Sequence, residues 1–179
     1  MDYDKTLPLH IMLTLISGTN RDHSKTFELS KYYVDILNTK NIDFQLLDLK
    51  NIHSLQRDAS FIELEKQYLL PAKAFIFILP EYNAGIPGIF KLMMDNSDVR
   101  NCFNNKYAAL VGLGSGRGGN LRGIDYTTNM CHYLKMHVYY NKLLLSNINE
   151  LINANGAITS TQTQLDIQQQ IEGYLQFIK

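Results

Sequence analysis

Short apolar runs alternate with longer segments of helical periodicity along the whole chain. The runs are rich in β-branched and aromatic residues, as strands buried on both faces are. In the segments between them, apolar residues recur at spacings of three and four, as on one face of a helix. This alternation predicts βαβ units and a parallel sheet. The five predicted strands cover residues 9–16, 42–47, 74–79, 107–113 and 138–145.

Capping residues indicate where the predicted helices begin. In two segments a hydroxyl residue is followed three positions later by Glu or Gln, which is the spacing of a capping box. These pairs are Ser60 with Glu63, in a helix that ends at Pro71, and Thr161 with Gln164 in the last helix. The other helices are predicted to start at Ser24 and to cover residues 90–96 and 121–136.

Five strands that alternate strictly with five helices predict a doubly wound α/β sheet. Right-handed crossovers leave few topologies open, and we expect the strand order 2-1-3-4-5 with helices on both faces. Such sheets bind ligands beyond the carboxyl ends of the strands, at the switch point between strands one and three. With 179 residues, the chain is expected to form a single domain over residues 1–179.

Composition excludes several classes of partner. Seventeen basic residues balance seventeen acidic ones, so neither nucleic acid nor an anionic membrane is an expected partner. No apolar stretch approaches the ~20 residues of a membrane span, and the N-terminal residues do not have the sequence features of a signal peptide. Cys102 and Cys131 are too few for a disulfide framework, so we expect a cytoplasmic protein. The scattered histidines predict no metal site.

The loop after the first predicted strand is rich in groups that can bind phosphate. A dianionic phosphate needs several donors at once, and a helix N-terminus adds free N–H groups and a favourable dipole. The alternative is a capped turn whose hydroxyls satisfy only the backbone. It is not a Walker loop, because Gly-Lys-Ser/Thr is missing. The candidate phosphate ligands are Ser17, Thr19, Arg21, Ser24, Lys25 and Thr26.

Two further unusual loops follow strands three and four. The first contains two prolines and two glycines, a stiff backbone against which a planar heterocycle can lie; the alternative is a tight strand-to-helix connection. The second matches the Gly-x-Gly-x-x-Gly sequence of the dinucleotide-binding motif, but that motif belongs after the first strand of a nucleotide-binding unit. The alternative is a flexible connector. The candidates here are Pro80, Glu81, Tyr82 and Asn83 in one loop, and Ser115, Gly116, Arg117 and Gly118 in the other.

Taken in order, these three motifs resemble the NADPH-dependent FMN reductase family, which includes azo-, quinone- and chromate-reducing flavoenzymes. The resemblance implies a flavodoxin-like three-layer sandwich, bound FMN, NADPH or NADH as donor, a small-molecule acceptor, and a homodimer or homotetramer. The first loop would hold the flavin phosphate, and the other two would flank the isoalloxazine. One departure is Gly85, which stands where many relatives carry serine.

Little chemistry is then required of side chains, because hydride transfer belongs to the flavin. We therefore expect no catalytic acid or base, and ping-pong kinetics. Arg117 and Arg122 are the candidates for contact with the 2′-phosphate of NADPH. Two alternatives remain open at this point. One is a flavodoxin-type electron carrier with no nicotinamide reaction of its own, and the other is a flavin-free binding module.

Overall fold

The computed structural model describes residues 11–153 and 156–179. Its centre is a parallel sheet in the order β2-β1-β3-β4-β5, with β6 also paired to β4. This confirms the predicted strand order. Residues 9 and 10 of the first predicted strand lie outside the described residues. The strands are β1 Leu13–Ser17, β2 Phe44–Asp48, β3 Ala74–Pro80, β4 Tyr107–Leu113, β5 His137–Val138 and β6 Leu143–Leu145.

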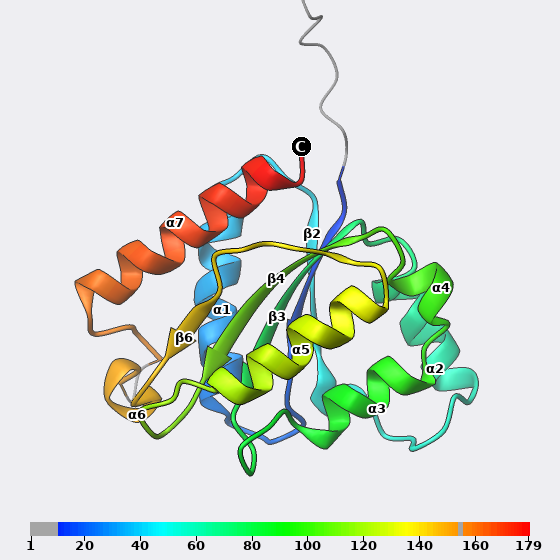
Figure 1. Ribbon diagram of the computed structural model, residues 1–179, viewed down its shortest axis with the longest axis horizontal. Coiled ribbons are helices and arrows are strands. Elements are labelled where there is room, and N and C mark those ends of the chain that lie inside the picture. The colour runs from blue at the N-terminus through cyan, green and yellow to red at the C-terminus, as the bar shows by residue number, and fades with distance from the viewer. Residues whose placement is uncertain (1–10, 154–155) are drawn as a thin grey trace, which may run out of the picture.

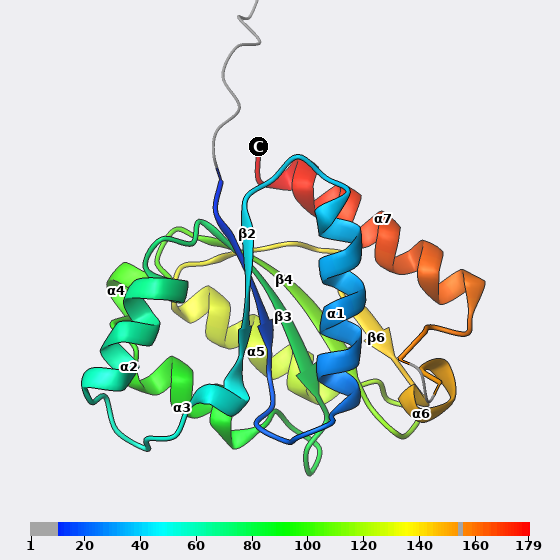
Figure 2. The same ribbon diagram turned by 180° about the vertical axis from the view of Figure 1, so that it is seen from behind.

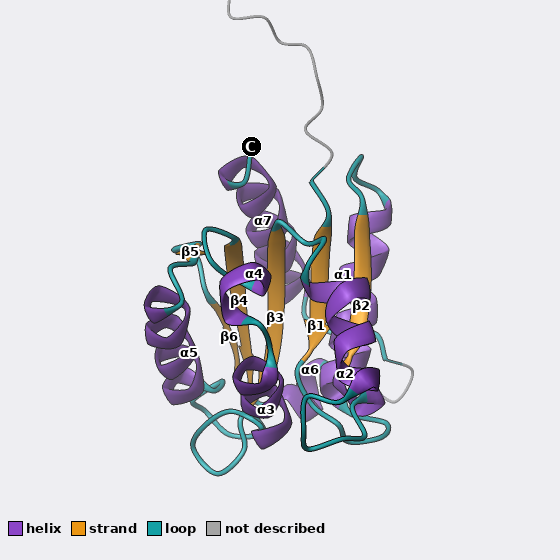
Figure 3. Cartoon of the chain, turned by 90° about the vertical axis from the view of Figure 1, so that its right-hand side faces the viewer, coloured by secondary structure: helices purple, strands orange, loops and turns teal. Residues whose placement is uncertain are grey.

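Helices cover both faces of this sheet, so the fold has three layers (Figures 1, 2 and 3). One layer contains α1 Lys25–Asn38, α6 Ile148–Leu151 and α7 Thr161–Phe177. The opposite layer contains α2 Ala59–Leu64, α3 Gly88–Asn96, α4 Val99–Cys102 and α5 Leu121–Tyr133. A 3-10 turn, Leu49–Asn51, follows β2, and a π-helical segment, Glu65–Leu69, continues α2. None of the described helices combines the length and the apolar content needed to cross a membrane.

The central strand β3 shows why the apolar runs predicted buried strands. All seven of its residues are buried, and successive side chains face opposite layers. Phe75 and Phe77 pack toward α3, where Phe77 and Phe90 have ring centroids 5.2 Å apart. Ile76 belongs to the other core, under α1 and α7. Each buried side chain of this size contributes roughly 1.5–3 kcal/mol.

The predicted fifth strand, residues 138–145, is wrong as a continuous element. The structure divides it into β5 and β6, which pair with the two halves of β4. Between them, Tyr139 is buried against Tyr174 and Phe177 of α7, with ring centroids 5.7 Å and 5.4 Å away. The Tyr139 N–H still donates to Ala108 O of β4 at 2.8 Å, and beyond it Gln170 Nε2 of α7 donates to Leu110 O of β4 at 3.1 Å and to Asn141 O at 2.9 Å, so a side chain of α7 takes the place of strand pairing between β5 and β6.

Helix boundaries also differ from those predicted. Asp58, rather than Ser60, caps α2 by accepting a hydrogen bond from the Phe61 N–H, and Ser160, rather than Thr161, caps α7. Ser24 caps α1, as expected. The predicted helix over residues 121–136 ends at Tyr133. Neighbouring polar residues can serve the same cap, so the local pattern alone does not determine which one is used.

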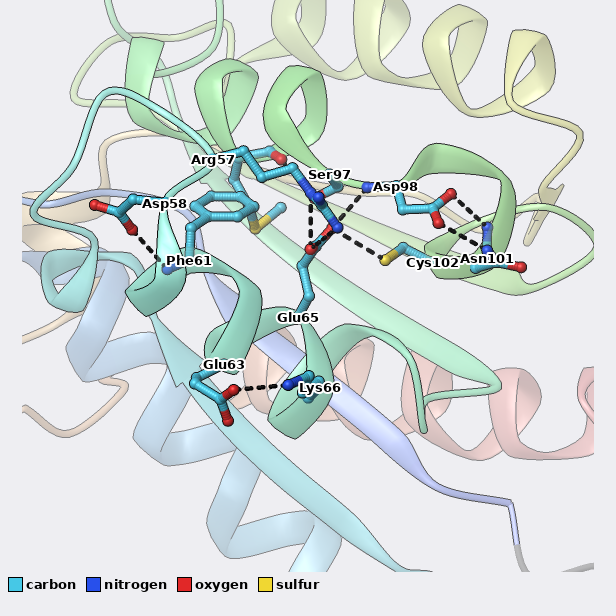
Figure 4. Close-up of polar contacts among 11 residues, drawn as sticks. Arg57, Asp58, Phe61, Glu63, Glu65, Lys66, Ser97, Asp98, Asn101 and Cys102 are labelled. Atoms are coloured by element: carbon cyan, nitrogen blue, oxygen red, sulfur yellow. Dashed lines mark hydrogen bonds and ion pairs between the residues drawn. The ribbon is translucent and has the colours of Figure 1, made fainter.

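A buried carboxylate joins three segments on the α2 side of the sheet (Figure 4). Glu65 Oε2 lies 2.7 Å from Arg57 Nη2 and 3.0 Å from Arg57 Nε. Its other oxygen accepts the Asp98 N–H at 2.6 Å and the Cys102 thiol at 3.7 Å. Glu65 therefore fixes the loop before α2 and the start of α4 to the π-helical segment.

We expect the buried thiol of Cys131 to make the fold sensitive to alkali. Burial raises its pKa from an ordinary 9.0 to about 12. The folded state keeps this proton longer than the unfolded state does, so the stabilisation is complete below pH 9 and is lost as pH rises toward 12. The loss reaches about 2 kcal/mol by roughly pH 10.5.

Urea unfolding of wild type and Cys131→Ala between about pH 8 and about pH 10.5 measures this loss. The stability advantage of wild type over the variant should shrink by that amount. Lys106, whose pKa burial lowers to about 8, has the opposite effect but is present in both proteins and cancels. An advantage that stays constant with pH would contradict the assignment.

Candidate active site

Three loops meet at the carboxyl ends of the central strands, at the lower edge of the sheet in Figures 1 and 2. They follow β1, β3 and β4, which are neighbours in the sheet. Two backbone hydrogen bonds join their bases, from Gly18 N to Ile78 O at 2.9 Å and from Glu81 N to Leu113 O at 2.7 Å. The predicted candidate residues are thus gathered at one rim, at the switch point of the topology.

Gly18 is where the first loop passes closest to β3. A Cβ atom added there would overlap the Leu79 side chain and lie 2.7 Å from the Ile78 carbonyl oxygen. A backbone carbonyl cannot move aside as a flexible side chain can. The sequence Ser17-Gly18-Thr19 therefore requires glycine at its centre.

The first and second loops are joined by side chains. The Thr19 and Tyr82 hydroxyl oxygens are 2.6 Å apart, and either can be the donor. The Arg21 N–H donates to Thr19 Oγ1 at 3.3 Å, and the Arg21 guanidinium stacks 4.2 Å from the centroid of the Tyr82 ring. Candidates that the sequence placed in different motifs are thus in direct contact.

Ser17 tests whether the site fits a phosphate-bearing cofactor. Its side chain is fully buried as the last residue of β1, and its Oγ has no hydrogen-bond partner among the described residues. A buried hydroxyl without a partner is costly, and a ligand oxygen would satisfy it. The nearby N-terminus of α1 adds a favourable dipole for an anion. The residues present therefore fit the phosphate of FMN.

Two other predicted phosphate ligands have side-chain partners within the protein, and a third is buried. The Ser24 oxygen accepts the Phe27 N–H, which leaves its O–H free to donate to a ligand. Lys25 Nζ donates to the carbonyl oxygens of Ile152 and Asn153, at 2.9 Å and 3.1 Å, so its ammonium lies at the end of α6. Thr26 is buried.

Carboxylates lie beside the first loop as well as cations. Asp48 is the register partner of Ser17 at the end of β2, and sequence reasoning did not single it out. Burial raises the pKa of Asp48, and the nearby Asp22 adds to this rise, whereas the backbone N–H and charge of Lys50 oppose it. The region beside the first loop thus contains interacting acidic groups as well as the basic Lys50.

A tight turn shapes the second loop. Tyr82 and Gly85 exchange two backbone hydrogen bonds of 3.0 Å, while Asn83 and Ala84 have φ values of 52° and 62°. Two central residues with positive φ define a type I′ turn, which favours Asn-Gly. Ala84 is thus strained, whereas Gly85 is not. A Cβ atom at Gly85 would have only Tyr82 O, at 3.8 Å, within 4 Å among the described residues, so a serine would fit there.

Ala84→Gly should stabilise the protein. The left-handed conformation costs an L-residue roughly 1–2 kcal/mol, and the greater chain entropy of unfolded glycine returns part of this. We expect a net gain of about 0.5–1 kcal/mol in the free energy of unfolding. Urea unfolding measures it, with Ala59→Gly at the start of α2 as the control that should destabilise. A loss of stability in Ala84→Gly would show that the turn is not strained.

The third loop depends on a segment that sequence reasoning missed. Gly114 N donates to Leu145 O at 3.0 Å, Asn147 N to Gly116 O at 3.1 Å, and Ile148 N to Gly114 O at 3.0 Å. The Ser146 hydroxyl also donates to Arg117 O at 2.6 Å. Residues 145–148 therefore hold Ser115, Gly116, Arg117 and Gly118 in place. Nothing in the local sequence pattern marks this segment as a support.

Asn120 was also missed, and it links the third loop to the second. It is fully buried with φ 67°, its N–H donates to Glu81 Oε2 at 3.2 Å, and its Nδ2 donates to Leu79 O at 2.9 Å. The available signal was the Gly119-Asn120 pair before a helix, since asparagine favours both caps and positive φ. Glu81 thus contacts the third loop, in addition to its predicted place in the second.

Two hollows on the surface lie away from the three loops. One, of about 300 Å³, is bordered by residues 51–54 and α2. The other, of about 400 Å³, runs between α3 and α5. Neither is lined by a predicted cofactor ligand.

Solved structures of flavoproteins share this architecture. FerB of Paracoccus denitrificans, a flavoenzyme NAD(P)H:(acceptor) oxidoreductase, superposes with a TM-score of 0.78 at 21% identity, covering 94% of this chain and 97% of FerB. EMOB, an NADH:FMN oxidoreductase solved in its apo form, gives 0.74 at 17% identity, covering 92% and 88%. An archaeal flavodoxin gives 0.59 at 13% identity, covering 90% and 94%. The fold is therefore flavodoxin-like.

The sequence itself defines the family within this fold. Residues 11–150 match the model of the NADPH-dependent FMN reductase family, and the chain belongs to that family. A 2-hydroxy-1,4-benzoquinone reductase of a Burkholderia species is 23% identical over 179 residues, covering 94% of this chain and 97% of the relative. An NAD(P)H-dependent FMN reductase of Pseudomonas aeruginosa is 25% identical over 114 residues, covering 62% of each. The chain is an oxidoreductase with FMN as cofactor and a reduced nicotinamide as donor.

Proposed function

We propose that this protein passes hydride from NADPH or NADH through bound FMN to a small acceptor, by ping-pong kinetics. The observation that carries this proposal is the buried Ser17 hydroxyl at the end of β1, which has no hydrogen-bond partner among the described residues. When bound, FMN supplies the redox chemistry, and the protein binds and orients it. Quinones, azo compounds and free flavin are the acceptor classes we propose, because relatives in the family carry quinone-reductase and azoreductase names.

The proposed roles follow the three loops. The hydroxyls of the first loop and Arg21 bind the phosphate, although Lys25 contributes only if it leaves its carbonyl partners near α6. Residues 80–83 lie against the isoalloxazine, and residues 115–118 border its far side. The chain works as one domain, and Arg117 or Arg122 contacts the 2′-phosphate when NADPH is the donor.

We further propose that the protein is a homodimer and that a second copy covers the α3–α5 groove. Met94, Met130 and Leu134 line this groove, and Tyr133 on its rim is 87% exposed. Its margin carries the Lys91–Asp95 ion pair, so two copies related by a two-fold axis can pair these charges across the contact. Two buried free cysteines support a reducing compartment, for which we propose the cytoplasm.

An absorbance experiment tests the proposed reaction. Purified protein is mixed with FMN, freed of unbound flavin, and treated without oxygen with NADPH or NADH in separate cuvettes. Bleaching of the bound flavin at turnover speed, followed by recovery of colour with a quinone, is the expected result. Bound flavin that stays oxidised with both nucleotides would instead favour an electron carrier. Protein that retains no flavin would contradict the proposal.

A further inference from the structure

The contact between Thr19 and Tyr82 joins two loops to which different parts of the cofactor were assigned. Thr19 belongs to the phosphate loop and is only 1% exposed, whereas Tyr82 belongs to the loop beside the ring. Their hydroxyl oxygens are 2.6 Å apart, which is a short hydrogen bond. The phosphate and ring subsites are therefore in direct contact through these two side chains.

The number of hydrogen bonds that the Thr19 hydroxyl can donate and accept determines which of the two hydroxyls is the donor. A hydroxyl has one donor and two acceptor sites. One acceptor site takes the Arg21 N–H at 3.3 Å. If the single proton of Thr19 is donated to a phosphate oxygen, the Tyr82 hydroxyl must be the donor to the remaining acceptor site. All three sites of Thr19 are then used.

Tyr82 is held in the position that this arrangement needs. Its backbone is fixed by the two hydrogen bonds of the turn with Gly85, and its ring is covered by the Arg21 guanidinium at 4.2 Å. Hydrogen bonds in a chain polarise one another. A hydrogen bond donated by Tyr82 to Thr19 therefore strengthens the hydrogen bond that Thr19 donates to the phosphate. A fixed donor also reduces the ordering that binding requires.

We propose that Tyr82 is a positioning residue for the flavin phosphate, acting through Thr19, as well as a wall of the ring subsite. This inference rests on the proposed FMN site and adds a role to a residue that the sequence motif assigns to the ring alone. Loss of the Tyr82 hydroxyl should therefore weaken binding of the phosphorylated flavin selectively.

Binding of FMN and riboflavin to the full-length protein tests this, because riboflavin has the same ring and no phosphate. Quenching of flavin fluorescence gives both dissociation constants for wild type, Tyr82→Phe, Thr19→Val and the double variant. Tyr140→Phe serves as a matched control, since Tyr140 is 81% exposed and lies outside the three loops. Thermal unfolding monitors the fold of every variant.

Tyr82→Phe should weaken FMN binding by about five-fold, the value of one hydrogen bond, and leave riboflavin binding within about two-fold of wild type. In the Thr19→Val background the same change should have no further effect on FMN. Equal weakening for both flavins, or no change for either, would overturn the inference while leaving the FMN site intact. If wild type bound neither flavin, the proposed function itself would fail, and the inference with it.

Discussion

Gly18→Ala is expected to lower the free energy of unfolding by about 2–3 kcal/mol and to weaken FMN binding at least about ten-fold. The added methyl group would overlap Leu79 and press on the Ile78 carbonyl oxygen, which belongs to the central strand. Relief requires the first loop to move away from β3. That movement would lengthen the Gly18 N to Ile78 O hydrogen bond and displace Thr19 from Tyr82.

Urea unfolding and fluorescence titration with FMN measure the two effects of Gly18→Ala. Gly88→Ala is the matched control, because a Cβ atom there would have no neighbour within 4 Å and Gly88 opens a helix. The control should be as stable as wild type or slightly more so. Wild-type stability in Gly18→Ala would mean that the loop has room to move and is not fixed by this contact.

Glu65→Ala should lower the free energy of unfolding by about 2–3 kcal/mol. The carboxylate is buried and accepts hydrogen bonds from Arg57 and from the Asp98 N–H, so its removal leaves the amide without a partner (Figure 4). Arg57 is 44% exposed and returns to water, which keeps the loss below that of a fully buried ion pair. Glu65→Gln keeps an acceptor for the amide and should lose less.

The control for this prediction lies on the same stretch of helix. Glu63 pairs with Lys66 at 2.8 Å, but both side chains are more than half exposed, at 71% and 58%. Glu63→Ala should therefore change stability by no more than about 0.5 kcal/mol. Equal losses at the two positions, measured by urea unfolding, would show that burial of the Glu65 carboxylate carries no special weight.

The local sequence pattern predicted an element correctly where a single physical requirement determined its structure. The continuous apolar run at residues 74–79 predicted β3, because such a run is typical of a strand that is buried on both faces. The prediction of a continuous fifth strand was wrong because the sequence of this segment, rich in aromatic residues, suits an unbroken strand as well as it suits the interrupted structure observed. The structure instead has Gln170 of α7 donating to Leu110 O and Asn141 O between β5 and β6, a long-range contact that no local pattern indicates. Asp58 and Ser60 were both suitable caps, and in the structure Asp58 caps the helix.

For the same reason, some features of the candidate site could be predicted from the sequence and others could not. The strand order places the ends of β1, β3 and β4 together, so the three loops could be expected to meet. The links between them are long-range pairs such as Glu81 with Asn120, and no local spacing encodes these. Lys25, a basic residue beside the phosphate motif, donates to carbonyl oxygens at the end of α6, and this long-range contact is likewise not indicated by the local sequence.

The interruption between β5 and β6 has a consequence for behaviour at high concentration. An edge strand with an unbroken row of N–H and C=O groups can recruit a strand from another molecule, which starts aggregation. Here this edge is divided into pieces of two and three residues, with the exposed side chain of Tyr140 at the bend between them. Neither piece is long enough to template a foreign strand. The interruption between β5 and β6 thus protects the molecule from self-association through this edge of its sheet.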